Sequence, residues 1–128
     1  MKRIIALSLM AAALLSGCSS SSSVKTLDAQ AFSEIAAKSS TYVLDVRTPG
    51  EFIAGHLVNA HNIDVEASNF GTEIAKLDKN ATYAVYCHSG NRSAVATAQM
   101  AKAGFDHIYD LNGGILAWAS AGGALVTN

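Results

Sequence analysis

The chain has 128 residues, of which 50% are hydrophobic and 15% charged, and its formal net charge is −1, with 9 basic and 10 acidic residues. It has no basic run interleaved with aromatic residues, so composition argues against a nucleic-acid-binding protein. The length suits a single domain that can bury a core without disulfide bonds.

The N-terminal segment has the pattern of a signal peptide. Lys2 and Arg3 supply a positive start, and residues 4–15 form an apolar run too short to span a bilayer comfortably. Residues 15–18, Leu-Ser-Gly-Cys, resemble a bacterial lipobox, whose cysteine is lipidated and becomes the mature N-terminus. The alternative is an ordinary secretory signal in which Cys18 is incidental.

Three parts are therefore predicted: a lipoprotein signal peptide over residues 1–17, a serine-rich tether over 18–23 and one domain over 24–128. A lipid on Cys18 implies anchoring in the bacterial cell envelope, facing the periplasm. Ser19 after the cysteine implies the outer membrane if the cell is Gram-negative.

Cysteine usage narrows the chemistry. The chain has 2 cysteines, and with Cys18 lipidated, Cys87 is the only remaining thiol. A lone thiol forms no internal disulfide and has no resolving partner, which argues against a dithiol oxidoreductase. Since the histidines lack metal-ligand spacing and Cys87 has no adjacent ligand, we expect no metal.

Short apolar runs alternate with helical patterns along the domain, which is typical of an α/β fold with parallel strands. Asp28 is a candidate N-cap, and Gly104 fits a helix end. The β-branched and aromatic run over residues 82–86 is expected to be central. The expected strands are 42–46, 62–64, 82–86 and 107–111, and the expected helices follow Asp28 and cover 49–55, 66–77, 92–103 and 114–120.

The strongest functional signal begins at Cys87, which an apolar strand pattern delivers into a polar loop containing Gly90. A helical pattern starts immediately afterwards, at Arg92. Backbone N–H groups and the positive end of a helix favour negative charge, so a thiol there loses its proton more readily and becomes a nucleophile. The alternative is a buried cysteine that only packs.

Four segments of the chain resemble the single-domain rhodaneses, a family of sulfurtransferases. Residues 87–93 (CHSGNRS) fit the family's CxxGxRS active-site loop. Residues 42–47 (YVLDVR), 51–63 (EFIAGHLVNAHNI) and 111–118 (LNGGILAW) resemble its other conserved segments, in the family's order. The resemblance covers roughly residues 26–122 and implies a three-layer α/β domain, with a mostly parallel sheet of about five strands and helices on both faces.

The resemblance also implies an activity. Cys87 would take sulfane sulfur from a small anionic donor such as thiosulfate, hold it as a persulfide, and pass it to cyanide or a thiol. No metal or organic cofactor is implied. The physiological acceptor could be a small thiol or a protein thiol, including an unidentified protein of the envelope.

Loop residues are expected to hold the sulfur through converging N–H groups from His88, Ser89, Gly90, Asn91, Arg92 and Ser93. Gly90 is expected to adopt a positive φ. Arg92 either turns toward an incoming anion or braces the loop by pairing with an acidic residue. Ser93 either donates to the sulfur or caps the helix, and His88 could face the substrate.

Four residues outside the loop are expected to have supporting or structural roles. Asp45 either accepts hydrogen bonds from the loop or fixes the turn after its own strand. Arg47 and Glu51 are expected to form an ion pair across a turn. His56 is expected to stabilise a buried turn by a hydrogen bond.

Loop length separates two related chemistries. Four residues lie between Cys87 and Arg92, whereas the related cysteine phosphatases have a loop one residue longer that fits a tetrahedral phosphate. Sulfur transfer is therefore favoured. Two-domain rhodaneses, however, usually place cations where this chain has Ser89 and Glu51, which weakens the expectation of tight thiosulfate binding.

A binding or sensing role is the competing interpretation. Rhodanese domains also serve as non-enzymatic modules, and Cys87 could detect oxidants or reactive sulfur near a membrane partner. Multiple turnovers with a common donor would favour the enzyme, and a stable persulfide with slow turnover would favour the sensor.

Overall fold

The structure, a computed structural model, describes residues 22–128. The predicted signal peptide, the lipidation of Cys18 and most of the tether fall outside the described residues. Within them, sheet hydrogen bonding starts at Ser23, whose carbonyl accepts from the N–H of Ile108 at 3.2 Å.

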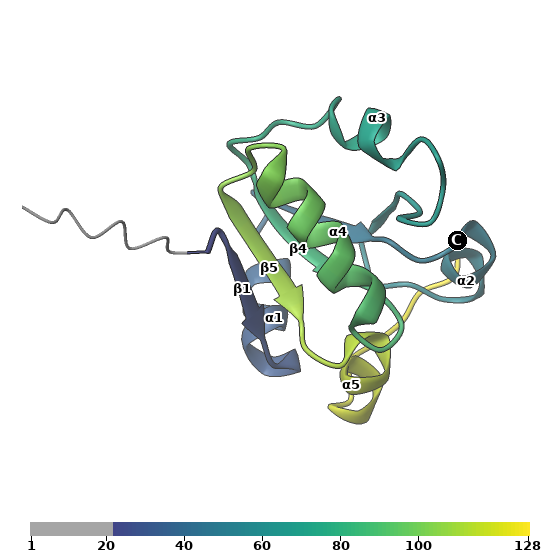
Figure 1. The fold of residues 1–128 in the computed structure, drawn as a ribbon. Coiled ribbons are helices and arrows are strands. Elements are labelled where there is room, and N and C mark those ends of the chain that lie inside the picture. The colour runs from purple at the N-terminus through teal and green to yellow at the C-terminus, as the bar shows by residue number, and fades with distance from the viewer. Residues whose placement is uncertain (1–21) are drawn as a thin grey trace, which may run out of the picture.

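Five parallel strands form one sheet in the order β1-β5-β4-β2-β3 (Figure 1). Their bounds are β1 Val24–Leu27, β2 Thr41–Asp45, β3 His61–Asn62, β4 Thr82–Tyr86 and β5 His107–Leu111. The predicted central position of β4 is confirmed, because β4 pairs with β2 on one side and with β5 on the other. All strands run in one direction, so their carboxyl ends meet at one edge.

Helices cover both faces of the sheet, as the α/β prediction requires. They are α1 Ala29–Ala36, α2 Pro49–Ala54, α3 Phe70–Ile74, α4 Asn91–Lys102 and α5 Gly114–Ser120. One buried cluster joins α3 and α4 to the sheet through Phe70, Met100 and Val85. A second joins α1 and α5 to the opposite face through Phe32 and Ile115. The central strand is apolar on both faces because both are covered.

The third helix is shorter than predicted. A helix was expected over residues 66–77, but only Phe70–Ile74 is helical. The Asp64 carboxylate accepts from the N–H of Glu66 at 2.9 Å, which forms a local turn in place of a first helical turn. After Ile74 the chain tightens again, with the N–H of Leu77 bonded to the Ile74 carbonyl.

In the part of the chain that the structure describes, no helix is both long enough and apolar enough to cross a membrane. The same residues contain no cluster of histidine, cysteine and acidic side chains arranged to hold a metal ion.

Candidate active-site loop

Cys87 is the first residue after β4, at the carboxyl edge of the sheet, and α4 begins four residues later at Asn91. Gly90 lies between them with φ 108°, so the predicted positive φ is confirmed. Residues with a side chain rarely adopt this angle, whereas glycine does so without steric cost. The glycine therefore allows the chain to turn back over the sulfur before the helix starts.

The Cys87 sulfur is held by polar contacts although its side chain is only 1% exposed. Its Sγ accepts from the N–H of Gly90 at 3.0 Å and lies 3.3 Å from the Ser93 hydroxyl. That hydroxyl is also 3.2 Å from the Gly90 carbonyl. Burial is what a purely packing cysteine predicts, but a packing cysteine needs no hydrogen-bond donor aimed at its sulfur.

Ser93 contacts the sulfur rather than capping the helix. No side chain caps the N-terminus of α4, where Gly90 is the N-cap residue. Since the Ser93 hydroxyl bridges Sγ and the Gly90 carbonyl, it can accept from a thiol or donate to a thiolate.

Several loop amides have no protein acceptor. Within residues 22–128, five backbone N–H groups of the loop make no hydrogen bond to a protein acceptor. They are the amides of His88, Ser89, Asn91, Arg92 and Ser93. Unpaired amides at a helix start form a site for negative charge. Of the converging donors that the sequence pattern predicts, the Gly90 N–H is the one that the structure shows bonded to the sulfur.

The start of α5 sets the orientation of the loop peptides. The N–H groups of Ile115 and Leu116 donate to the carbonyls of Cys87 and His88 at 2.9 and 3.2 Å. In a trans peptide the N–H points opposite to the C=O, so the amides of His88 and Ser89 point away from α5. Gly114 permits this approach, because a Cβ there would lie 2.5 Å from the His88 carbonyl oxygen. The adjacent glycines of LNGGILAW were the only sequence signal of this contact.

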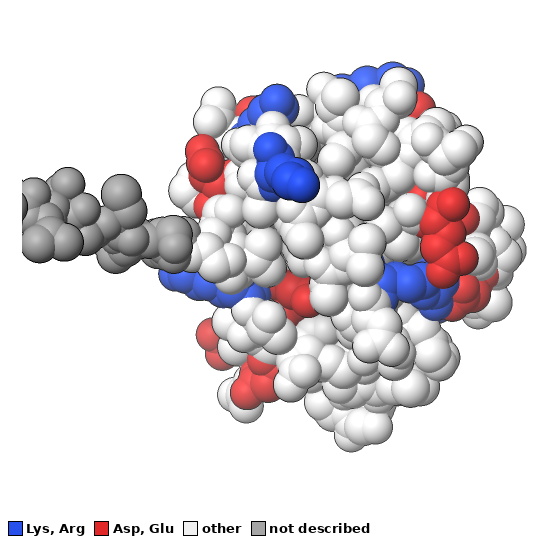
Figure 2. Space-filling model, in the orientation of Figure 1, with Lys and Arg blue, Asp and Glu red and all other residues white. Residues whose placement is uncertain are grey.

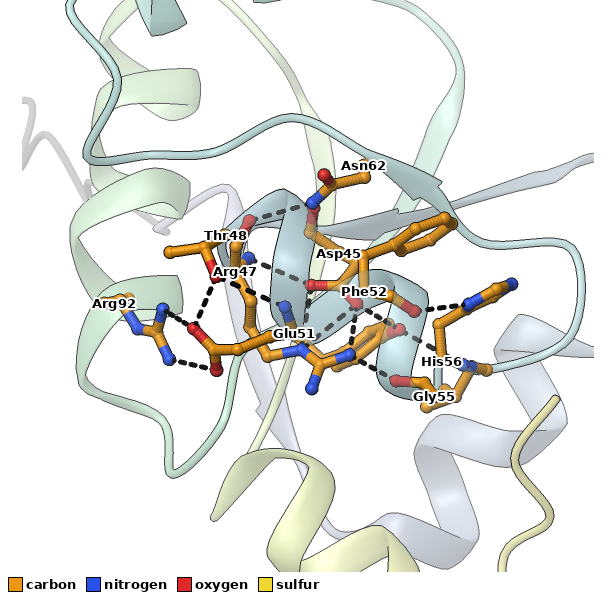
Figure 3. Close-up of polar contacts among 11 residues, drawn as sticks. Asp45, Arg47, Thr48, Glu51, Phe52, Gly55, His56, Asn62 and Arg92 are labelled. Atoms are coloured by element: carbon orange, nitrogen blue, oxygen red, sulfur yellow. Dashed lines mark hydrogen bonds and ion pairs between the residues drawn. The ribbon is translucent and has the colours of Figure 1, made fainter. Parts of the chain in front are cut away.

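Arg92 braces the loop rather than projecting as a free cation. Its two terminal nitrogens bind both carboxylate oxygens of Glu51 at 2.8 and 2.9 Å (Figure 3). A second carboxylate, on Glu66, lies 4.0 Å away. The hydrogen bonds from Arg92 lower the pKa of Glu51 to about 2. Of the two roles predicted for Arg92, the structure supports pairing with an acidic residue.

The predicted ion pair between Arg47 and Glu51 is wrong. Arg47 instead binds the buried Asp45 carboxylate through Nε and Nη2, with a shortest distance of 2.7 Å (Figure 3). Arg47 Nη2 also donates to the Gly55 carbonyl at 2.7 Å. Arg47 thus turns back into the loop between β2 and α2, which leaves Glu51 facing Arg92.

Asp45 organises the end of its own strand, the second of the two roles considered for it. The carboxylate accepts from the backbone N–H of Arg47 at 2.9 Å and from the Tyr86 hydroxyl at 2.7 Å. Burial and the neighbouring Asp45 charge raise the pKa of Tyr86 well above its ordinary range. Because Tyr86 precedes Cys87, this contact joins the turn after β2 to the strand that carries the cysteine.

His56 performs the predicted structural role. Its Nδ1 donates to the Phe52 carbonyl at 2.8 Å, and its ring stacks on that of Phe52 with centroids 3.8 Å apart (Figure 3). His88, by contrast, is exposed in the loop.

Asp110 is a buried acid that the sequence interpretation did not select. It lies at the carboxyl end of β5, and within residues 22–128 its Oδ1 has no hydrogen-bond partner. Burial raises its pKa, and an interaction with the Ser93 hydroxyl lowers it in part. A single aspartate within a strand pattern carried no signal that would have identified it.

A family model for the Rhodanese-like domain matches residues 28–121, well over half of the chain. The chain belongs to the rhodanese family.

Several curated proteins similar to this rhodanese domain are named as sulfurtransferases. It is 37% identical over 79 residues to the thiosulfate sulfurtransferase GlpE of Pseudomonas aeruginosa, covering 61% of this chain and 69% of that protein. It is 43% identical over 77 residues to the probable adenylyltransferase/sulfurtransferase MoeZ of Mycobacterium tuberculosis. That match covers 60% of this chain but only 20% of MoeZ, so the chain spans a small part of the longer relative.

Solved structures agree with the rhodanese fold. A rhodanese-related protein from Thermoplasma volcanium matches with a TM-score of 0.72 and 34% identity, over 81% of this chain and 99% of that one. The Alr3790 protein from Anabaena matches with a TM-score of 0.72 and 25% identity, over 80% of this chain and 82% of that one.

Proposed function

We propose that the protein is a sulfurtransferase that carries sulfane sulfur as a persulfide on Cys87. The observation that carries this proposal is the Gly90 N–H, which donates to the Cys87 sulfur at 3.0 Å in a loop whose other amides make no hydrogen bond to the protein within residues 22–128. Such donors stabilise a thiolate, and they stabilise the terminal sulfur of a persulfide in the same way. Family membership and the sulfurtransferase relatives support the same chemistry.

In the first half-reaction, the Cys87 thiolate attacks the outer sulfur of a donor such as thiosulfate. A new S–S bond forms, the old one breaks, and sulfite leaves with the bonding electron pair. In the second half-reaction, cyanide or a thiolate attacks the outer sulfur of the persulfide. The electron pair of the broken bond returns to Cys87 as thiolate, ready for another cycle.

The loop performs this cycle with electrostatics rather than a general base. Each half-reaction begins and ends with an anionic sulfur near the amide donors, and the fixed amides need no reorganisation as charge moves between sulfur atoms. The Ser93 hydroxyl can switch from accepting to donating as the thiol loses its proton.

The charges around the loop argue for modest affinity toward thiosulfate. Arg92 is neutralised by Glu51, and the loop position of Ser89 carries no cation. An anionic donor would therefore rely mainly on the loop amides.

The deciding experiment records the intact mass of the full chain, kept in mild detergent, after incubation with thiosulfate. We expect one extra sulfur on the parent, lost on addition of cyanide, and none at this position in Cys87→Ser. An unchanged parent mass with thiosulfate, and also with polysulfide as donor, would reject sulfur transfer through Cys87. Repeated release of thiocyanate supports the enzyme over the sensing module, and a persulfide that forms once and stays supports the sensor.

We also propose that the domain is lipid-anchored in the bacterial envelope through Cys18. The support is the charged start, the short apolar run and the lipobox-like residues that end at Cys18.

A further inference from the structure

A groove of about 400 Å³ lies beside the active-site loop, between α2, α5 and the C-terminal segment. Its volume falls within the range of small-molecule sites. His88 of the loop forms part of its lining, so a molecule bound there lies next to the segment that holds Cys87. The groove is lined largely by apolar side chains: Ala54, Ile115, Leu116, Ala119 and Leu125.

The walls are held by tertiary contacts. The N–H and C=O of Val126 pair with those of His56 at 2.8 and 3.0 Å, which holds the C-terminal segment against the domain. The Trp118 indole donates to the Ala124 carbonyl at 3.0 Å. Leu125, between these two contacts, remains 44% exposed at the groove, and Leu116 of α5 remains 52% exposed. Large apolar side chains left at the edge of a preformed hollow favour an apolar ligand.

The charged groups at the groove are neutralised in pairs. Glu51 is bound by Arg92, and Arg47 is bound by Asp45 (Figure 3). Helix α5 itself has no charged residue, and the face drawn in Figure 2 is white where α5 lies. A small anion therefore finds no unpaired positive charge in this groove to offset the loss of its hydration. An uncharged molecule pays only a small desolvation cost on entering it.

Arg47 nevertheless offers one hydrogen-bond donor to the groove. Its side chain is only 5% exposed, and Nε and Nη2 bind Asp45 and Gly55. Among the described residues, Nη1 has no acceptor, and it is drawn without a contact in Figure 3. Because Arg47 is one of the residues that line the groove, an N–H without an acceptor on its guanidinium suits a neutral oxygen, such as a carbonyl, on the ligand.

We propose that this groove binds the uncharged, apolar body of a small thiol that accepts sulfur from Cys87. This inference rests on the proposed persulfide chemistry and names its acceptor class. The acceptor thiolate attacks the outer sulfur of the persulfide, the Cys87 S–S bond breaks, and its electron pair returns to Cys87. The sulfur leaves as the persulfide of the bound thiol, so atoms and charge balance without a further oxidant.

The test loads the full chain with sulfur, removes the donor, and mixes the persulfide with ethanethiol, propanethiol or butanethiol. These thiols have similar acidity and differ in apolar length. Loss of the extra sulfur is followed by intact mass. We expect the second-order rate constant to rise about fourfold per methylene, which corresponds to about 0.8 kcal/mol for each buried CH₂. Mercaptoethanesulfonate, an anionic thiol, should react more slowly than butanethiol.

Variants connect the effect to the groove. Leu125→Ser should reduce the dependence on chain length, while discharge to cyanide stays at the parent rate. The matched control is Val95→Ser, because Val95 is 53% exposed on α4 and borders a different surface hollow. The control should behave like the parent.

The outcomes separate this inference from the proposed function. A persulfide that discharges to cyanide but reacts equally with all three alkanethiols, or fastest with the anionic thiol, overturns the groove assignment and leaves sulfur transfer intact. If no donor loads Cys87, sulfur transfer and the groove assignment both fail.

Discussion

At the scale of single residues, opposite charges are paired so that no free cation stands beside the Cys87 loop in the described part of the chain. Glu51 takes both terminal nitrogens of Arg92, and Asp45 takes Nε and Nη2 of Arg47. These pairs connect the turn after β2 to the loop and to the strand before it. They therefore hold the loop in position, and binding of an anion is left to the backbone amides.

The Glu51–Arg92 pair makes stability depend on pH. The folded-state pKa of Glu51 is about 2, against an ordinary value of 4.5. The stability that ionised Glu51 adds to the folded state is therefore fully present above pH 4.5 and is lost as pH falls toward 2. We expect Glu51→Gln to cost about 1 kcal/mol near neutral pH, and the difference from the parent to vanish in that acid range.

Urea unfolding at several pH values measures this difference. Glu73→Gln is the matched control, because Glu73 pairs with Lys76 at the surface, where the lysine side chain is 65% exposed. Exposed pairs contribute little, so the control should follow the parent. A Glu51→Gln penalty that persists unchanged at low pH would contradict the assignment.

A second prediction at this scale concerns the Tyr86 hydroxyl. Its hydroxyl donates to Asp45 and accepts from the Leu57 N–H at 3.1 Å, all in buried surroundings. Tyr86→Phe leaves that amide and one carboxylate oxygen short of partners, at an expected cost of about 1–3 kcal/mol in urea unfolding. Tyr83→Phe should cost less, because the carbonyl it releases belongs to the exposed Asp78, where water can replace the hydroxyl.

At the scale of elements, the start of α5 supports the active-site loop from behind. Two of its backbone N–H groups bind the carbonyls of Cys87 and His88, and Gly114 allows the close approach with φ 61°. The helix thus orients the loop amides through its own backbone.

Gly114→Ala should therefore damage both the loop and stability. The new Cβ would meet backbone atoms of His88 at 2.5 Å and would need a left-handed φ. We expect about 1–3 kcal/mol of destabilisation and a marked loss of sulfur loading, measured by urea unfolding and intact mass. Gly71→Ala is the control, since a Cβ there meets nothing within 4 Å and Gly71 lies within α3. It should be neutral or slightly stabilising, and equal effects of the two substitutions would refute the role of Gly114.

At the scale of the whole molecule, the parallel sheet separates the start of the domain from its active-site loop. All strands begin at one edge and end at the other, so Val24 and Cys87 lie at opposite edges (Figure 1). A tether attached at Val24 would therefore join the domain at the edge of the sheet opposite the loop.

Lipidation of Cys18 is the prediction at this scale. In bacterial cells given a radiolabelled fatty acid, the parent should be labelled and sediment with membranes. Cys18→Ser should be unlabelled and released, with sulfur loading of Cys87 unchanged. An unlabelled parent in the soluble fraction would reject the anchor.

Local patterns were enough to predict four of the five strands, the central strand, the position of Cys87 and the positive φ of Gly90, but not the first strand, β1. Each depends on residues that are neighbours in the chain, through hydrophobic periodicity or through the backbone freedom of one glycine. The third helix was overestimated because the Asp64 turn competes with helix formation in a segment of suitable periodicity.

Tertiary structure alone decided which partners the charged and polar groups chose. Arg92 and Glu51 are 41 residues apart in the chain, as are Tyr86 and Asp45, and each pair meets only when β2 and β4 lie side by side. The sequence predicted Glu51 as the partner of Arg47, but the bend of the chain after β2 brings Asp45 to it instead. The apolar groove has the same origin, because its walls come from α2, α5 and the C-terminal segment, which only the folded sheet brings together.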